Sequence, residues 1–229
     1  MSRFSRLEAL QSILDIGLVP LFDTEDPDAA ERIVATCAVA GARVVEFRNR
    51  REQAFLTFAE LARRVSRSQP SVILGIGSVV DAPTAALYLA AGANFVVSPI
   101  LNEEVARLCN RQKVAYLPGC GSVSEISAAE ELGVEICKIF PGTEVGGPGF
   151  VKAVLAPCPW TRVMPTGGVD ATQESVSAWI KAGAACLGMG SRLITKTMER
   201  GAELEVLATT VTEVLTWIQS ARACRGISA

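Results

Sequence analysis

Eight short apolar runs rich in β-forming residues recur every 20–28 residues along the chain, and helical patterns lie between them. The runs are GLVPLFD (17–23), ARVVEF (42–47), SVILGIGS (71–78), ANFVVSP (93–99), KVAYLPG (113–119), EICKIFP (135–141), TRVMPTGG (161–168) and AACLGMG (184–190). Nearly all are apolar on both faces, which is typical of parallel strands covered by helices on both sides. The pattern therefore predicts alternating strands and helices.

Eight such units favour a closed barrel over an open doubly wound sheet. An open sheet more usually has five or six strands and a GxGxxG motif in its first unit, and GLVPLFDTED carries none. The length of 229 residues suits one barrel, which usually takes about 250. No linker or composition break interrupts the chain. We predict an α/β fold: a single-domain (β/α)₈ TIM barrel over residues 1–229, with an N-terminal and a C-terminal helix.

The net charge and the hydropathy of the chain limit the classes of molecule that it is expected to bind. The net charge is −2 and no basic run occurs, so we expect no nucleic-acid partner. No stretch approaches the roughly 18 apolar residues of a membrane span, and the start MSRFSRLEALQSILDIG lacks the apolar region of a signal peptide. We expect no membrane association and a cytoplasmic location.

The chain has no histidine and seven cysteines. The missing histidine excludes Ser-His-Asp and Cys-His catalysis and HExxH metalloprotease chemistry. Because the cysteine number is odd and no CxxC occurs, we interpret the cysteines as free thiols in a reducing compartment. We expect no metal site and no cofactor, so acid–base chemistry falls to carboxylates, Lys, Tyr, Cys or water.

Lys138 is the one lysine of five that lies inside an apolar β-rich run. A buried amine has a lowered pKa and forms Schiff bases with carbonyl compounds. The other four, Lys113, Lys152, Lys181 and Lys196, are predicted to be surface charges. A lysine at the barrel rim, or one paired with an acid, remains the alternative for Lys138.

Barrel enzymes place their chemistry at the carboxyl ends of the strands. Glu46 lies at the carboxyl end of the second predicted strand. Its carboxylate is either an ion-pair partner of Lys138 or a general base. Arg50 is suited to clamp a carboxylate, although the run from Arg48 to Arg51 also fits a solvated basic loop. The glycine-rich turns Pro-Thr-Gly-Gly (165–168) and Gly-Met-Gly-Ser (188–191) follow strands seven and eight, where barrels frequently bind phosphate.

Six motifs, in this order and spacing, resemble the bacterial 2-keto-3-deoxy-6-phosphogluconate (KDPG) and 4-hydroxy-2-oxoglutarate (KHG) aldolases. They are Val-Val-Glu-Phe-Arg-Asn-Arg (44–50), Gly-Ile-Gly-Ser-Val (75–79), Val-Ser-Pro (97–99), Leu-Pro-Gly-Cys-Gly-Ser-Val-Ser-Glu (117–125), Lys-Ile-Phe-Pro (138–141) and Met-Pro-Thr-Gly-Gly-Val (164–169). The resemblance covers residues 8 to 220 or so.

The resemblance implies a homotrimeric class I aldolase that acts on a small 2-keto acid and an aldehyde. Lys138 matches the family's Schiff-base lysine and Glu46 its proton-transferring glutamate. The expected substrate contacts are Arg50, Ser78, Pro99 and Thr166, and the expected phosphate contacts are Gly167, Gly168, Gly190 and Ser191. A non-aldolase phosphate-binding barrel (an isomerase or synthase) and an inactive barrel that only binds a sugar-acid phosphate are the alternatives.

The chain departs from the family pattern at two strand ends. Ser78 stands where many members have threonine, which keeps the hydroxyl group. Arg48 also replaces a threonine of many members, and it adds a cation near the expected site. Arg48 therefore puts the substrate preference in question.

Overall fold

The computed structural model describes residues 2–224, and a strand or helix lies in each predicted region. The predicted domain of residues 1–229 extends past this part by residue 1 and residues 225–229, which lie outside the described residues. No helix in the described range is long and apolar enough to cross a membrane.

The strands are short and their side chains are buried. They are β1 (Leu18–Phe22), β2 (Val44–Arg48), β3 (Ile73–Gly77), β4 (Phe95–Val97), β5 (Ala115–Leu117), β6 (Gly119–Cys120), β7 (Cys137–Ile139), β8 (Val163–Pro165) and β9 (Leu187–Met189). The helices are α1 (Arg6–Ile16), α2 (Pro27–Val39), α3 (Ala54–Ser68), α4 (Ala82–Ala90), α5 (Glu103–Gln112), α6 (Val123–Glu131), α7 (Gly147–Leu155), α8 (Gln173–Ala182), the 3₁₀ helix η1 (Met198–Arg200) and α9 (Leu204–Ala223).

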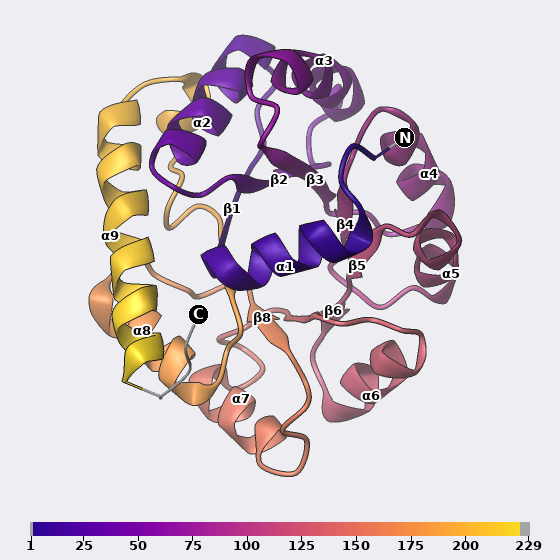
Figure 1. Ribbon diagram of the computed structural model, residues 1–229, viewed down its shortest axis with the longest axis vertical. Coiled ribbons are helices and arrows are strands. Elements are labelled where there is room, and N and C mark those ends of the chain that lie inside the picture. The colour runs from indigo at the N-terminus through magenta and orange to yellow at the C-terminus, as the bar shows by residue number, and fades with distance from the viewer. Residues whose placement is uncertain (1, 225–229) are drawn as a thin grey trace.

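All paired strands run parallel, and they form two sheets. A curled six-stranded sheet has the order β5-β4-β3-β2-β1-β9, and a three-stranded sheet has the order β6-β7-β8. The fifth predicted strand is divided between the two sheets at Pro118, whose nitrogen carries no hydrogen for a ladder bond. On the other side, an isolated parallel bridge pairs Thr166 with Gly188. Figure 1 shows α2 to α9 arranged around these strands.

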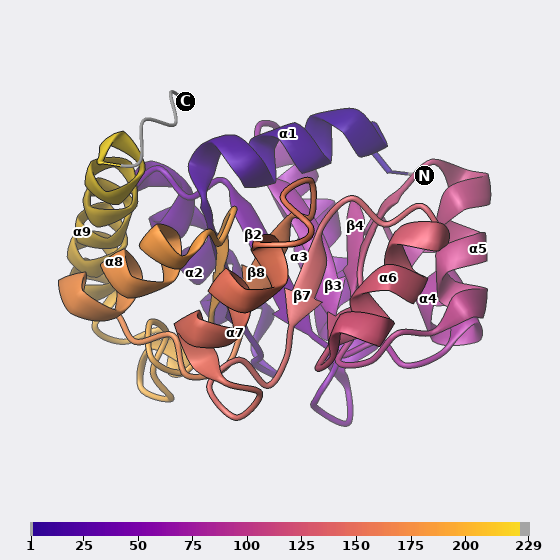
Figure 2. The same ribbon diagram turned by 90° about the horizontal axis from the view of Figure 1, so that it is seen from below.

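Two apolar cores fill the molecule. The larger one lies between the strands and the surrounding helices, and includes Phe22, Phe47 and Phe58. The smaller one joins inward-facing residues of the strands, such as Phe95 and Met164, to three residues of α1. They are Ala9, Leu10 and Ile13. Helix α1 thus closes one end of the strands, as Figures 1 and 2 show.

Local signals fix α1 at that end. Ser5 and Glu8 form a capping box that satisfies the first N–H groups, and Gly17 ends the helix with φ of 76°. Because β1 begins at the next residue and the paired strands are parallel, their carboxyl ends lie at the face opposite α1. That face is where the predicted site residues belong.

Candidate active site

Lys138 lies at the centre of β7, beside Gly119 of β6 and Met164 of β8. Its side chain is buried, and Nζ lies 5.0 Å from the centre of the Phe140 ring. Burial lowers the pKa of Lys138; the carboxylate of Glu46 opposes this shift, and Arg50 adds to it. The other four lysines are exposed, which confirms the prediction that Lys138 is the exception.

Glu46 is as deeply buried as any group of the site. It lies in β2, and Gly77 of β3 leaves the space that its carboxylate fills: a Cβ atom at Gly77 would lie 2.5 Å from Glu46 Cδ. Glu46 Oε2 has no hydrogen-bond partner within the described residues. Burial raises the pKa of Glu46, and the charge of Lys138 is the largest opposing cause. The two groups are therefore electrostatically coupled, and burial favours the neutral form of each.

Arg50 and Ser78 meet at the ends of β2 and β3. Arg50 is exposed, and its Nε donates a hydrogen bond to Ser78 Oγ at 3.1 Å. Ser78 has a φ of 60°, in the left-handed region, where its hydroxyl turns toward the arginine. Pro99 follows β4, and its carbonyl oxygen occupies the space beside Gly119 where a Cβ atom would be.

Thr166 carries a second buried polar atom without a partner. It follows β8, is buried, and its Oγ1 accepts and donates no hydrogen bond in the described structure. The hydroxyl lies where a side chain on Gly188 would be, so Gly188 allows this approach. Thr166 thus places an unpaired hydroxyl group at a strand end next to β7.

The two glycine turns lie next to each other after β8 and β9. Gly167 and Gly168 have φ of 89° and 74°, which other residues rarely adopt. The carbonyl oxygens of Thr166 and Gly167 accept hydrogen bonds from the N–H groups of Gly142 and Thr143, at 2.9 and 3.2 Å. The glycine-rich segment after β7 therefore supports the first turn. In the second turn, Gly190 is half-buried and Ser191 is exposed.

Arg48 is not part of a solvated basic loop. It is buried, and its Nη2 forms ion pairs with Asp23 and, at 3.0 Å, with Glu199. Asp23 is recognisable in the sequence as a polar residue at the end of the first strand. Glu199 is not, because it lies in η1, beyond the last strand and outside any motif. Sequence reasoning missed it for that reason.

Comparison with known proteins decides the family. The family model described as "KDPG and KHG aldolase" matches residues 11–209. The chain belongs to the KDPG and KHG aldolase family.

Individual aldolases agree with this assignment. A 2-dehydro-3-deoxy-phosphogluconate aldolase of Treponema pallidum is 35% identical over 71% of this chain and 74% of its own. A protein of the same name from Haemophilus influenzae is 29% identical over 72% and 76%. A solved 4-hydroxy-2-oxoglutarate/2-dehydro-3-deoxyphosphogluconate aldolase from TTHB1 superposes with a TM-score of 0.79 at 27% identity, covering 92% of this chain and 98% of that one.

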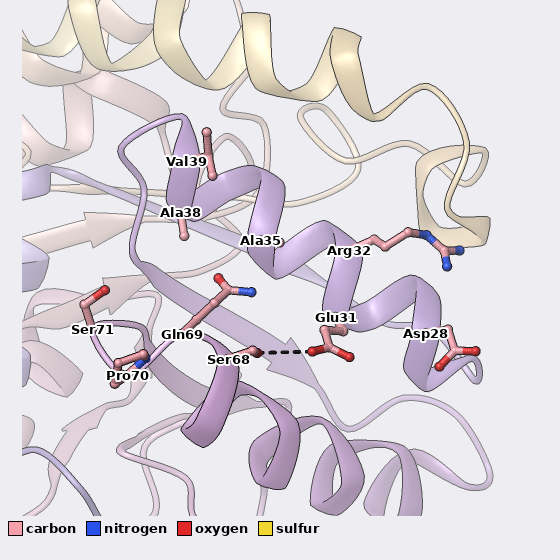
Figure 3. A pocket seen from close by; sticks show the side chains of 10 residues that line it. All are labelled: Asp28, Glu31, Arg32, Ala35, Ala38, Val39, Ser68, Gln69, Pro70 and Ser71. Atoms are coloured by element: carbon pink, nitrogen blue, oxygen red, sulfur yellow. Dashed lines mark hydrogen bonds between the residues drawn. The ribbon is translucent and has the colours of Figure 1, made fainter.

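A separate hollow of about 700 Å³ lies between α2 and the end of α3 with residues 69–71 that follow it. Figure 3 shows side chains of α2 on one side and Ser68 with the loop after it on the other, with Ser68 Oγ donating to Glu31 at 3.1 Å. None of the predicted aldolase site residues lines it. No cluster of three or more potential ligands among His, Cys, Asp and Glu is found in the described part of the chain.

Proposed function

We propose that this chain is a class I aldolase that cleaves a 2-keto-3-deoxy sugar acid phosphate, such as KDPG, or 4-hydroxy-2-oxoglutarate to pyruvate and an aldehyde. The observation that carries the proposal is Lys138: an amine buried in a strand, with a lowered pKa, coupled to the buried carboxylate of Glu46. An isomerase or synthase on the same fold gives no reason for a lysine at this position.

In the proposed reaction, neutral Lys138 attacks the C2 carbonyl of the 2-keto acid, and loss of water gives an iminium that accepts electrons. Arg50 binds the adjacent carboxylate, and Ser78, Pro99 and Thr166 line the substrate. The hydrogen bond between Arg50 and Ser78 supports this role, because it holds the guanidinium at the strand ends.

Glu46 then removes the proton of the C4 hydroxyl, directly or through water, and the C3–C4 bond breaks. The aldehyde leaves and an enamine of pyruvate remains on Lys138. Glu46 returns a proton to C3, and water hydrolyses the iminium to release pyruvate. One carboxylate serves each step because its acid and base forms alternate. The free Oε2 of Glu46 supports this assignment over a fixed structural pairing.

We place a substrate phosphate on the backbone N–H groups of Gly167, Gly168 and Gly190 and on Ser191. We further propose that the two sheets form one (β/α)₈ barrel and a single domain, joined by the Thr166–Gly188 bridge and across Pro118. A homotrimer follows from the family resemblance, and light scattering of the purified protein tests it. The cytoplasmic location stays a prediction.

Borohydride trapping tests the reaction. The protein is incubated with pyruvate and sodium borohydride, and the adduct is located by mass spectrometry and peptide mapping. We expect one pyruvate-derived adduct on Lys138, its loss in Lys138→Met, and its retention in Lys152→Met, which removes an exposed lysine of α7. A folded protein without any adduct refutes the Schiff base and leaves the two alternatives, a non-aldolase phosphate-binding enzyme and an inactive binding barrel. An adduct on Lys152 keeps the chemistry and overturns the site.

A further inference from the structure

Four charged side chains form a closed ring at the carboxyl ends of β1 and β2. This charge ring consists of Asp23, Arg48, Arg51 and Glu199. Arg48 Nη2 pairs with Asp23 Oδ1 and, at 3.0 Å, with Glu199 Oε1. Arg51 closes the ring from outside, with Nε 2.7 Å from Asp23 Oδ2 and Nη2 3.7 Å from Glu199 Oε2. Two cations thus meet two anions, and the ring is formally neutral.

The ring is buried on its inner side. The side chains of Asp23, Arg48 and Glu199 are 7, 11 and 9% exposed, whereas that of Arg51 is 42% exposed. Buried ion pairs contribute little net stability, because desolvation offsets most of the attraction, and their best-supported use is to specify geometry. The charge ring is therefore expected to fix the positions of the elements that it joins.

Arg48 binds the end of the segment 190–199 and lies close to its beginning, which follows β9. At one end, its Nη1 lies 3.5 Å from the position of a Cβ atom on Gly190. At the other end, its Nη2 holds Glu199. Hydrogen bonds run between these ends: the Gly190 carbonyl accepts from the N–H groups of Leu193 and Ile194 at 2.8 Å each, and the N–H of Glu199 donates to the Thr195 carbonyl at 2.9 Å.

We propose that Arg48 is a positioning residue for the phosphate of the substrate. Through its ion pair with Glu199 it fixes the segment 190–199, and with it Gly190 and Ser191. This inference rests on the proposed function, in which these two residues contact phosphate. Only a substrate whose aldehyde half reaches Gly190 and Ser191 binds more tightly because their position is fixed. The charge ring therefore favours 2-keto-3-deoxy sugar acid phosphates over the shorter 4-hydroxy-2-oxoglutarate.

The test must keep a cation beside Lys138 and Glu46, since Arg48 lowers the pKa of both groups. Glu199→Met retains Arg48 and removes the carboxylate that ties it to the segment. Arg48→Lys retains the charge, but the lysine Nζ is one bond closer to the backbone than Nη2, the atom that pairs with both Asp23 and Glu199, so it falls short of these carboxylates. Glu103→Met is the matched control, because it removes one carboxylate from an exposed ion pair with Arg107.

The kinetic parameters kcat and KM are measured for KDPG and for 4-hydroxy-2-oxoglutarate. In Glu199→Met and Arg48→Lys we expect KM for KDPG to rise about tenfold, as a binding site moved by less than 1 Å would give. For 4-hydroxy-2-oxoglutarate kcat/KM stays within about twofold, as it does for both substrates in Glu103→Met. In the double variant, KM for KDPG rises no further than in either single variant, because both changes break the same ion pair between Arg48 and Glu199.

A thermal shift with inorganic phosphate gives a readout that does not need catalysis. We expect phosphate to raise the unfolding temperature of the parent protein and to lose this effect in Glu199→Met and Arg48→Lys. An equal loss on both substrates, or additive effects in the double variant, overturns the positioning role. If one variant does not fold, the other decides. If the parent protein forms no pyruvate adduct but keeps the phosphate-dependent shift, the proposed function fails and the role of Arg48 stands.

Discussion

Replacing Gly77 by alanine would place a methyl group in the space that the Glu46 carboxylate occupies. The new Cβ atom would overlap Oε1 and lie 2.5 Å from Cδ and 2.9 Å from Cγ. Carbon atoms pack best at roughly 3.5–4.0 Å, so the carboxylate must retreat by about 1 Å. The φ of Gly77 is not in the left-handed region, so the alanine backbone itself is unstrained.

A catalytic group displaced by about 1 Å typically loses 10²-fold in rate. We therefore expect kcat/KM of Gly77→Ala to fall by about 10²-fold, equivalent to about 2.7 kcal/mol of lost transition-state stabilisation. The assay is steady-state cleavage of KDPG, followed through pyruvate release, with circular dichroism to confirm folding.

Gly75→Ala is the matched control, two residues earlier in β3. Its Cβ atom would overlap the Phe95 ring in the smaller core, not a group of the site. We expect it to lower the free energy of unfolding by about 1–3 kcal/mol and to leave kcat/KM of the folded fraction nearly unchanged. A folded Gly77→Ala with kcat/KM within about twofold of the parent would refute the catalytic placement of Glu46.

Three further predictions concern the titration of the site and the stability of the fold. The Glu46 carboxylate raises the pKa of Lys138, so Glu46→Gln lowers it; the rise of the borohydride trapping rate with pH, measured from pH 5 to 10 or so, then moves to lower pH. Gly149→Ala in α7 meets no atom within 4 Å and raises the free energy of unfolding, measured in urea, by about 0.5–1 kcal/mol; an unchanged midpoint would contradict this. Tyr88→Phe removes the 2.8 Å hydrogen bond from the phenol to Asn49 Oδ1 and costs about 1 kcal/mol in the same titration, whereas no loss would show that water replaces it.

The order and type of the elements were predictable because they depend on local patterns. The apolar runs and the helical patterns between them each depend on residues a few positions apart, and the described structure has a strand or helix in every region so predicted. One effect of a local residue was not predicted. Pro118 lies inside the fifth predicted strand, and the structure divides that strand between two sheets there.

Part of the site was predictable in the same way. Lys138 was singled out by its apolar neighbours along the chain, which favour burial of the strand. The structure excludes a position at the rim, because Lys138 is buried at the centre of β7. For Glu46 the local pattern left an ion pair and a general base open. The structure adds that Glu46 is coupled to Lys138, that its Oε2 has no partner in the described residues, and that its carboxylate occupies the space beside Gly77.

The sequence by itself thus determined the alternating elements, the buried lysine and the glycine turns, since each depends on residues that are close along the chain. Only the tertiary structure decided the environment of Arg48. Its partner Glu199 is 151 residues away in the sequence, and the two meet because the parallel strands bring the ends of β2 and the segment after β9 to the same face. From the sequence, one interpretation of Arg48 was a charge of a solvated basic loop. In the structure it is a buried member of the charge ring, because its burial and its ion pairs depend on contacts between residues that are far apart in the sequence.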